Sequence, residues 1–82
     1  MRIDKFMNSV NITKRRAVSE DMCRSGVVFI NDLKVKAAKA VKVGDKITLK
    51  FLEYDKCYEV LDIPTTKTIP KSKMSDYVKE IS

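Results

Sequence analysis

Residues 13–31 read TKRRAVSEDMCRSGVVFIN and decide the fold. The first part predicts a helix over residues 14–25, with Thr13 as its N-cap and Gly26 at the C′ position. After Gly26 the residues become β-branched and aromatic, which predicts a strand over residues 27–30. A helix followed directly by a strand indicates a mixed α and β architecture.

A shorter helix is predicted before this stretch. Ile3, Phe6, Met7 and Val10 recur at helical spacing, which gives one apolar face, and Asn11 ends the pattern. On the second helix, the expected apolar stripe is narrow and comprises Ala17, Val18 and Met22. The remaining surface of that helix is expected to carry Arg15, Arg16, Ser19, Glu20 and Arg24.

Short strands are expected beyond the second helix. Asn31 and Asp32 form a turn, and Gly44 supplies the positive φ that a second tight turn needs. Polar and apolar residues alternate over residues 46–51, which is typical of a half-buried strand. Pro64 ends the last strand. The predicted strands cover residues 27–30, 33–35, 46–51 and 57–63.

The fold class expected from this order is α+β. Two short N-terminal helices would pack on a small, curled, mainly antiparallel sheet. Residues 1–64 would form the domain, and residues 65–82 a C-terminal tail. The Thr, Lys and Ser content of residues 65–73 predicts a loop, and residues 74–81 could add a short helix or fray.

The composition argues against catalysis. The 82 residues include no His and only two Gly, and no Ser or Cys has a His partner for nucleophilic attack. Phosphate-binding Gly-rich loops are absent. Two isolated thiols, Cys23 and Cys57, cannot build a metal site without His. We therefore expect no enzyme activity, no metal and no cofactor.

The longest apolar run, residues 27–30, is too short for a signal peptide or a membrane span. A cytoplasmic protein with reduced thiols is the simplest interpretation. The charge is uneven: residues 1–50 hold twelve Lys/Arg and five Asp/Glu, or +7, and residues 51–82 hold five and six, or −1. A basic half favours a polyanionic partner, although a solvated lysine-rich surface explains the charge equally well.

Three cations, Lys14, Arg15 and Arg16, fall in the predicted first turn of the second helix. Each is unfavourable there by roughly 0.3–1 kcal/mol because of the helix dipole. A phosphate docked on the helix N-terminus would explain them, and the alternative is that all three are solvated. Further cations that could extend this surface are Arg2, Lys5, Lys34, Lys36, Lys39 and Lys42.

Aromatic residues are few. Phe6, Phe29 and Phe51 are expected in the core, which leaves Tyr54, Tyr58 and Tyr77 for contacts with bases. Recognition of single strands by stacking is therefore not favoured. The pattern indicates recognition of a folded RNA through its shape and phosphates.

Ordered blocks of residues resemble the ribosomal-protein S-four-type RNA-binding domain over about residues 1–52. The blocks are RIDKFM at 2–7, KRRA at 14–17, GVVFIN at 26–31, KA at 36–37 and VKVGD at 41–45. The resemblance implies the alpha-L fold, in which two helices and the β-turn beyond them grip structured RNA. It departs from the family at Asn31-Asp32, where Asn-Gly is usual, and at Lys14-Arg15-Arg16, a variation on Lys-Ser-Arg that the quality-control branch shares.

The short chain is similar to the ribosome-associated quality-control branch of this family, which is related to the fifteen-kilodalton ribosome-associated heat-shock protein. This implies a monomer that contacts large-subunit rRNA, peptidyl-tRNA and other quality-control factors after a stalled ribosome splits, and that supports tailing of the stalled chain. Arg2 and Arg16 would act as bidentate phosphate clamps. The candidate RNA-binding residues are Arg2, Lys5, Lys14, Arg15, Arg16, Asn31, Lys34, Lys36 and Lys39.

Other functions stay open at this point, among them an accessory role for an enzyme whose catalysis a partner chain supplies. A helix-turn-helix DNA-binding regulator also has two helices and a basic surface, but its second helix would here present Glu20 beside Arg16 and Ser19. A protein adaptor could use the basic face for an acidic partner. A ribosome-assembly factor or general rRNA-binding protein could carry the same domain.

Overall fold

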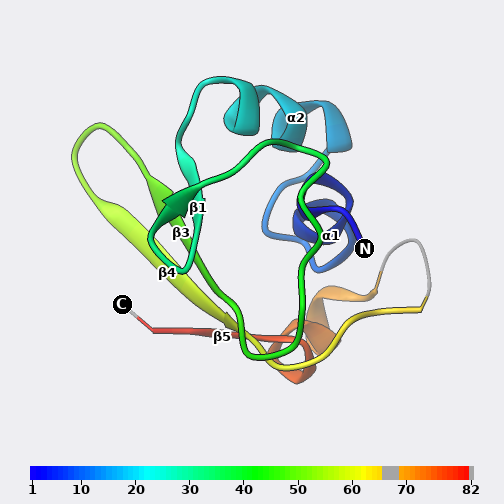
Figure 1. Ribbon diagram of the computed structural model, residues 1–82. Coiled ribbons are helices and arrows are strands. Elements are labelled where there is room, and N and C mark those ends of the chain that lie inside the picture. Colours follow the sequence, from blue (N-terminus) through cyan, green and yellow to red (C-terminus); the bar gives the residue numbers. More distant parts are fainter. Residues whose placement is uncertain (66–68, 82) are drawn as a thin grey trace.

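The computed structural model describes residues 1–65 and 69–81, and Figure 1 shows its elements. They are α1 (Ile3–Ser9), α2 (Arg16–Arg24), β1 (Val28–Ile30), β2 (Leu33–Lys34), β3 (Lys46–Lys50), β4 (Asp55–Val60), the 3-10 helix η1 (Lys71–Asp76) and β5 (Val78–Glu80). The strands form one antiparallel sheet in the order β2-β1-β3-β4-β5. The two helices lie beside each other on one side of this sheet (Figure 1). The expected α+β class is confirmed.

The core forms between α1 and the sheet. Ile3, Phe6 and Met7 on α1 are fully buried, as the helical spacing predicts. Val28 on β1 lies opposite Leu49 on β3, and because side chains alternate along a strand, both belong to the same buried face. The apolar face of α1 and the β-branched residues of the sheet therefore pack together in a single cluster.

Helix α2 begins at Arg16, two residues later than predicted. Arg15 takes the N-cap position with extended backbone (φ −136°, ψ 146°), so Lys14 and Arg15 lie outside the helix. The prediction that Thr13 caps α2 is wrong, because its hydroxyl is used elsewhere. It donates to the Arg15 carbonyl at 3.3 Å and shares a 2.5 Å hydrogen bond with the Ser19 hydroxyl.

The end of α2 matches the prediction. Gly26 has a φ of +77°, in the left-handed region that glycine enters without strain. The Gly26 N–H donates to the Cys23 carbonyl at 3.1 Å, and the Val27 N–H donates to the Met22 carbonyl at 3.2 Å. This pair of bonds is the Schellman motif, which turns the chain into β1.

The buried face of α2 differs from the predicted stripe. Ser19 and Cys23, one turn apart, are buried, whereas Ala17 and Val18 are exposed. Ser19 can be buried because its hydroxyl pairs with the Thr13 hydroxyl and is therefore satisfied. Small side chains on this face also let α2 approach α1 closely.

The aromatic residues are distributed differently from the prediction. Tyr58 is buried, because it lies opposite Ile47 in the β3–β4 register and shares its face. Phe51 follows the end of β3 and is 36% exposed. Phe29 is half-buried, and the Lys50 ammonium lies 4.4 Å from the centre of its ring, a cation–π contact. Only Phe6 is buried as the sequence predicts.

The C-terminal segment adds a strand that the sequence pattern does not indicate. β4 runs from Asp55 to Val60 instead of 57–63, and β5 pairs with its far edge, Val78 opposite Val60. The short helix expected within 74–81 is displaced to η1, and a helix over Val78 is wrong. The unpaired edge of β4 provides backbone hydrogen bonds that outweigh the weak local helical spacing.

Residue 69 ties this segment to α1. The Ile69 N–H donates to the Ser9 carbonyl at 3.0 Å, and the Asn11 side-chain amide donates to the Ile69 carbonyl at 2.8 Å. Ile69 and Val78 are both buried in the same core as α1. The division into residues 1–64 and 65–82 stays a prediction.

Replacing Val78 with Ala is expected to lower the free energy of unfolding by about 2 kcal/mol, because two buried methyl groups are lost and a cavity remains. Val43→Ala is the matched control, since Val43 is exposed in a turn and should change stability by less than about 0.5 kcal/mol. Urea denaturation measures both variants. Equal stability of the two would show that β5 adds nothing to the core.

Candidate nucleic-acid interface

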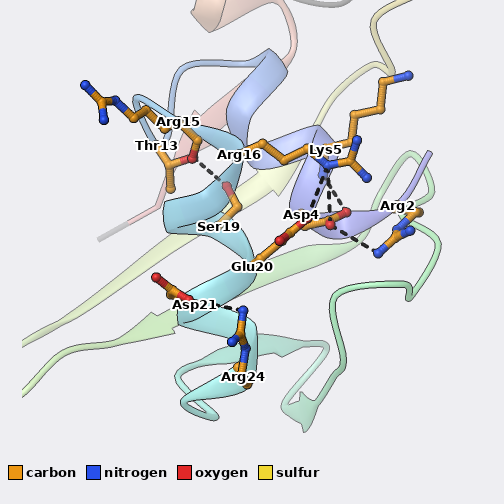
Figure 2. A network of polar contacts seen from close by, with 10 residues as sticks. All are labelled: Arg2, Asp4, Lys5, Thr13, Arg15, Arg16, Ser19, Glu20, Asp21 and Arg24. Carbon is orange, nitrogen blue, oxygen red and sulfur yellow. Dashed lines mark hydrogen bonds and ion pairs between the residues drawn. The ribbon is translucent and has the colours of Figure 1, made fainter.

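A buried carboxylate organises the basic surface. Asp4, in the first turn of α1, is fully buried and accepts a hydrogen bond from the Lys5 backbone N–H at 2.7 Å. The Arg2 guanidinium donates to Asp4 Oδ2 at 3.2 Å, and Arg16 Nε lies 3.5 Å from the same oxygen (Figure 2). A buried charge is costly unless it is paired, and here two cations pair with it.

The two guanidinium groups remain available to a ligand. The side chains of Arg2 and Arg16 are 50% and 45% exposed, so part of each planar fork faces solvent. Arg16 Nε also lies 3.7 Å from a Glu20 carboxylate oxygen, one helical turn away. Both forks are therefore held in place before any ligand arrives, which lowers the entropy cost of binding. A guanidinium fork matches the oxygens of a phosphate.

The expected cluster of three cations in the first turn of α2 does not form, because the helix begins at Arg16. Of Lys14, Arg15 and Arg16, only Arg16 lies inside the helix. Its unfavourable position is offset by Asp4 and Glu20, so a docked phosphate is not needed to explain it. The case for a phosphate site at Arg16 now rests on its exposed, oriented guanidinium.

The connector between β2 and β3 brings further lysines to Arg2. The Ile3 N–H donates to the Lys39 carbonyl at 2.7 Å, and Arg2 forms a bridge with Ala40. These bonds hold residues 36–40 along the start of α1. A groove of about 730 Å³ lies between this connector and α2, and the cations that line it are Arg2, Arg24, Lys34 and Lys36.

A second hollow, of about 580 Å³, adjoins the β1–β2 turn and includes Asn31, Lys34, Lys36 and Lys39 in its lining. Asn31 holds the turn itself: its side-chain oxygen accepts from the Lys46 N–H at 3.0 Å, and its amide donates to Asp45 at 3.2 Å. Asn31 and Asp32 have φ values of 51° and 69°, as a two-residue hairpin turn requires. Contact between Asn31 and RNA stays a prediction.

Three candidate residues lie apart from the Arg2–Asp4–Arg16 cluster. The Arg15 side chain points away from Asp4, as Figure 2 shows. Lys14 lines a third hollow, between α2 and the β3–β4 hairpin. Lys5 is exposed on α1, and only its backbone contacts Asp4. The roles of these three residues in RNA binding stay predictions.

Asp4 is a part of this surface that the sequence prediction missed, whereas Glu20 and Arg24 lie on the surface of the second helix as expected but were not assigned to the candidate site. Asp4 precedes the buried Met7 by three residues, so it lies beside the apolar face of α1. An acidic residue at that flank, two positions after Arg2, was the available signal. Arg24 lines the larger groove and pairs with Asp21 at 3.2 Å.

Cys23 provides no reactive centre near this surface. Burial in the core, followed by the negative charges of Asp4 and Glu20, raises the pKa of the Cys23 thiol to about 11. At neutral pH this thiol is almost entirely protonated and therefore a poor nucleophile. Cys23 and Cys57 are not joined by a disulfide. Within residues 1–65 and 69–81, no acidic or thiol cluster could hold a metal ion and no helix could cross a membrane.

Comparison with known proteins identifies the family. The S4 domain pattern matches residues 1–47. The RQC P-site tRNA stabilizing factor of Helicobacter pylori (strain ATCC 700392 / 26695) is 44% identical over 78 residues, which cover 95% of this chain and 93% of that protein. The chain belongs to the RQC P-site tRNA stabilizing factor family. The resemblance seen in the sequence blocks is confirmed.

Other relatives agree with this family assignment. The RQC P-site tRNA stabilizing factor of Bacillus subtilis (strain 168) is 32% identical over 81 residues, covering 98% of this chain and 94% of that protein. The solution structure of the hypothetical protein HP1423 superposes with a TM-score of 0.86 at 41% identity, over 100% of this chain and 98% of that one. This family is a family of RNA-binding factors and not a known class of enzyme.

The trimeric heat shock protein 15 of Vibrio cholerae has the same fold as this RQC family member. The TM-score is 0.88 at 23% identity, over 100% of this chain and 82% of that chain. The match spans the sheet and both helices, so the elements that hold Arg2, Asp4 and Arg16 belong to a shared scaffold.

Proposed function

We propose that this protein binds the P-site tRNA and the adjacent rRNA of large ribosomal subunits left by stalled, split ribosomes. In this role it stabilises peptidyl-tRNA while the stalled chain is tailed. The observation that carries the proposal is the pair of oriented, half-exposed guanidiniums held by the buried Asp4. The name of the relatives, RQC P-site tRNA stabilizing factor, supports the choice of RNA.

The proposed mechanism is electrostatic and non-catalytic. Arg2 and Arg16 each clamp a phosphate, and Lys34 and Lys36 at the neighbouring groove neutralise further phosphates of the same RNA. A-form RNA is recognised mainly through its backbone and shape, which suits a surface rich in cations and poor in base-reading side chains. The protein acts as a monomer in the cytoplasm, where ribosomes are found, and holds the RNA without changing it.

Co-sedimentation with isolated large subunits tests this function. The protein should bind subunits that carry peptidyl-tRNA more tightly than empty subunits. With about five phosphate contacts, the slope of log K against log[salt] should be near −4.

A random DNA duplex is the comparison ligand. A flat salt response, or equal affinity for this duplex and for the subunits, would contradict the proposal. Equal binding to both kinds of subunit would leave a general rRNA-binding protein.

A further inference from the structure

An aromatic groove lies outside the Arg2–Asp4–Arg16 cluster, between α2 and the β3–β4 hairpin. Its volume is about 340 Å³. Phe51 and Tyr54 line it from the hairpin, and they are 36% and 56% exposed. Their ring centroids lie 5.0 Å apart, and the Phe51 N–H donates to the Tyr54 carbonyl at 2.9 Å, so the turn holds the two residues side by side. Val18 and Met22 line the groove from α2.

The charges around this groove are positive. Lys14 and Lys56 line it, and no Asp or Glu of the described residues does so, although Glu53 and Asp55 lie elsewhere on the hairpin. Lys14 is exposed. Lys56 Nζ lies 3.8 Å from a Glu80 carboxylate oxygen in a solvent-exposed ion pair, so an RNA phosphate could take the place of that carboxylate. The groove therefore suits an occupant with a flat apolar part and a negative charge.

We propose that this groove binds one unpaired nucleotide of the RNA. The base stacks on Phe51 and Tyr54, and the flanking phosphates lie at Lys14 and Lys56. The inference rests on the proposed function and adds a site that reads unpaired bases. It revises the expectation that stacking is not favoured, which assumed that Phe51 is buried.

An RNA occupant is favoured over an acidic protein segment because the groove lies close to Arg16 of the Arg2–Asp4–Arg16 cluster. Lys14 is separated from the clamp residue Arg16 by one residue, so a single RNA could contact both. The net charge of +6 attracts RNA to the molecule as a whole, and most of it comes from residues 1–50, which include Lys14 and Arg16. Stacking on an aromatic side chain is sequence-tolerant, because every base has a π-face. We therefore expect a preference for unpaired bases without a preference for one base.

Three RNA hairpins with the same stem test the proposal by fluorescence anisotropy with the full-length protein. One stem is fully paired, the second has a single-nucleotide bulge, and the third has the same bulge without its base. The second and third hairpins carry the same phosphates, so only the base differs. The bulged hairpin should bind about tenfold more tightly than the abasic one.

Variants of the hairpin assign the effect to the groove. Tyr54→Ala and Phe51→Ala should each remove most of the preference, and Tyr54→Phe should keep it because the ring remains. Leu52→Ala is the matched control: Leu52 is fully exposed on the same hairpin but does not line the groove. Its preference should equal that of the wild-type protein.

Equal binding of the bulged and abasic hairpins would overturn the inference while leaving phosphate clamping intact. A preference that survives both alanine substitutions would also overturn it. Tight binding of an acidic peptide, Asp-Asp-Leu-Phe-Asp-Asp, that Tyr54→Ala abolishes but that RNA does not displace would assign the groove to a protein. Loss of binding to all three hairpins would instead contradict the proposed function.

Discussion

Asp4→Asn is expected to weaken RNA binding at least tenfold, although it removes a negative charge from the surface that is proposed to bind phosphates. Simple Coulomb attraction predicts the opposite sign. The loss is expected because the Asp4 carboxylate holds Arg2 and Arg16 together, and an amide cannot accept from two guanidiniums as strongly. The free energy of unfolding should fall by about 2 kcal/mol as the charge-assisted bonds are lost.

Asp21→Asn is the matched control for this prediction. It removes one negative charge from α2, but Asp21 is exposed, and its side chain pairs with the exposed Arg24. Its RNA affinity should be unchanged or slightly higher. Urea denaturation and binding to large subunits measure both variants. Tighter RNA binding by Asp4→Asn, at unchanged stability, would show that the carboxylate does not orient the clamp.

Arg16→Ala is expected to weaken binding to large subunits that carry peptidyl-tRNA about 30-fold, or about 2 kcal/mol. The estimate reflects the loss of an oriented, charge-assisted phosphate contact. Arg16→Lys should lie between the wild-type protein and Arg16→Ala, because it keeps the charge and loses the fork. The slope of log K against log[salt] should become shallower by about one unit in Arg16→Ala.

Arg24→Ala tests whether position matters beyond charge. Arg24 lies at the other end of α2, pairs with the exposed Asp21 and is not fixed by a buried carboxylate. We expect its effect on affinity to be less than threefold. Equal losses in Arg16→Ala and Arg24→Ala would mean that the protein binds RNA through net charge alone.

Local sequence patterns predicted the elements whose stability is local. The i, i+3, i+4 spacing from Ile3 to Val10 predicted α1. Gly26 predicted the end of α2, because a glycine after a helix readily takes the left-handed conformation that ends it. The predicted start of α2 was wrong because the Thr13 hydroxyl could either cap the helix or bond to another side chain. Only the packing of α1 against α2 determines that its hydroxyl pairs with Ser19. β5 depends on the distant edge of β4, which no local pattern reveals.

The candidate site shows the same division. Arg2 and Arg16 were predicted as RNA-binding residues from the sequence and the family resemblance, and both lie on one surface. Their common partner was missed, because Asp4 contacts Arg16 across twelve residues of sequence. The aromatic groove was missed for a related reason. Phe51 is buried or exposed according to where β3 ends, and β3 ends at Lys50.

The contact between residue 69 and the end of α1 links the two ends of the chain during folding. The bond from Asn11 to the Ile69 carbonyl spans 58 residues of sequence, and closing so long a loop is slow compared with forming a local helix. α1 therefore gains its last support only after the C-terminal third has been synthesised. During translation, the end of α1 receives this contact late, whereas Arg2, Asp4 and Arg16, whose contacts with one another lie within the first 16 residues, do not depend on it.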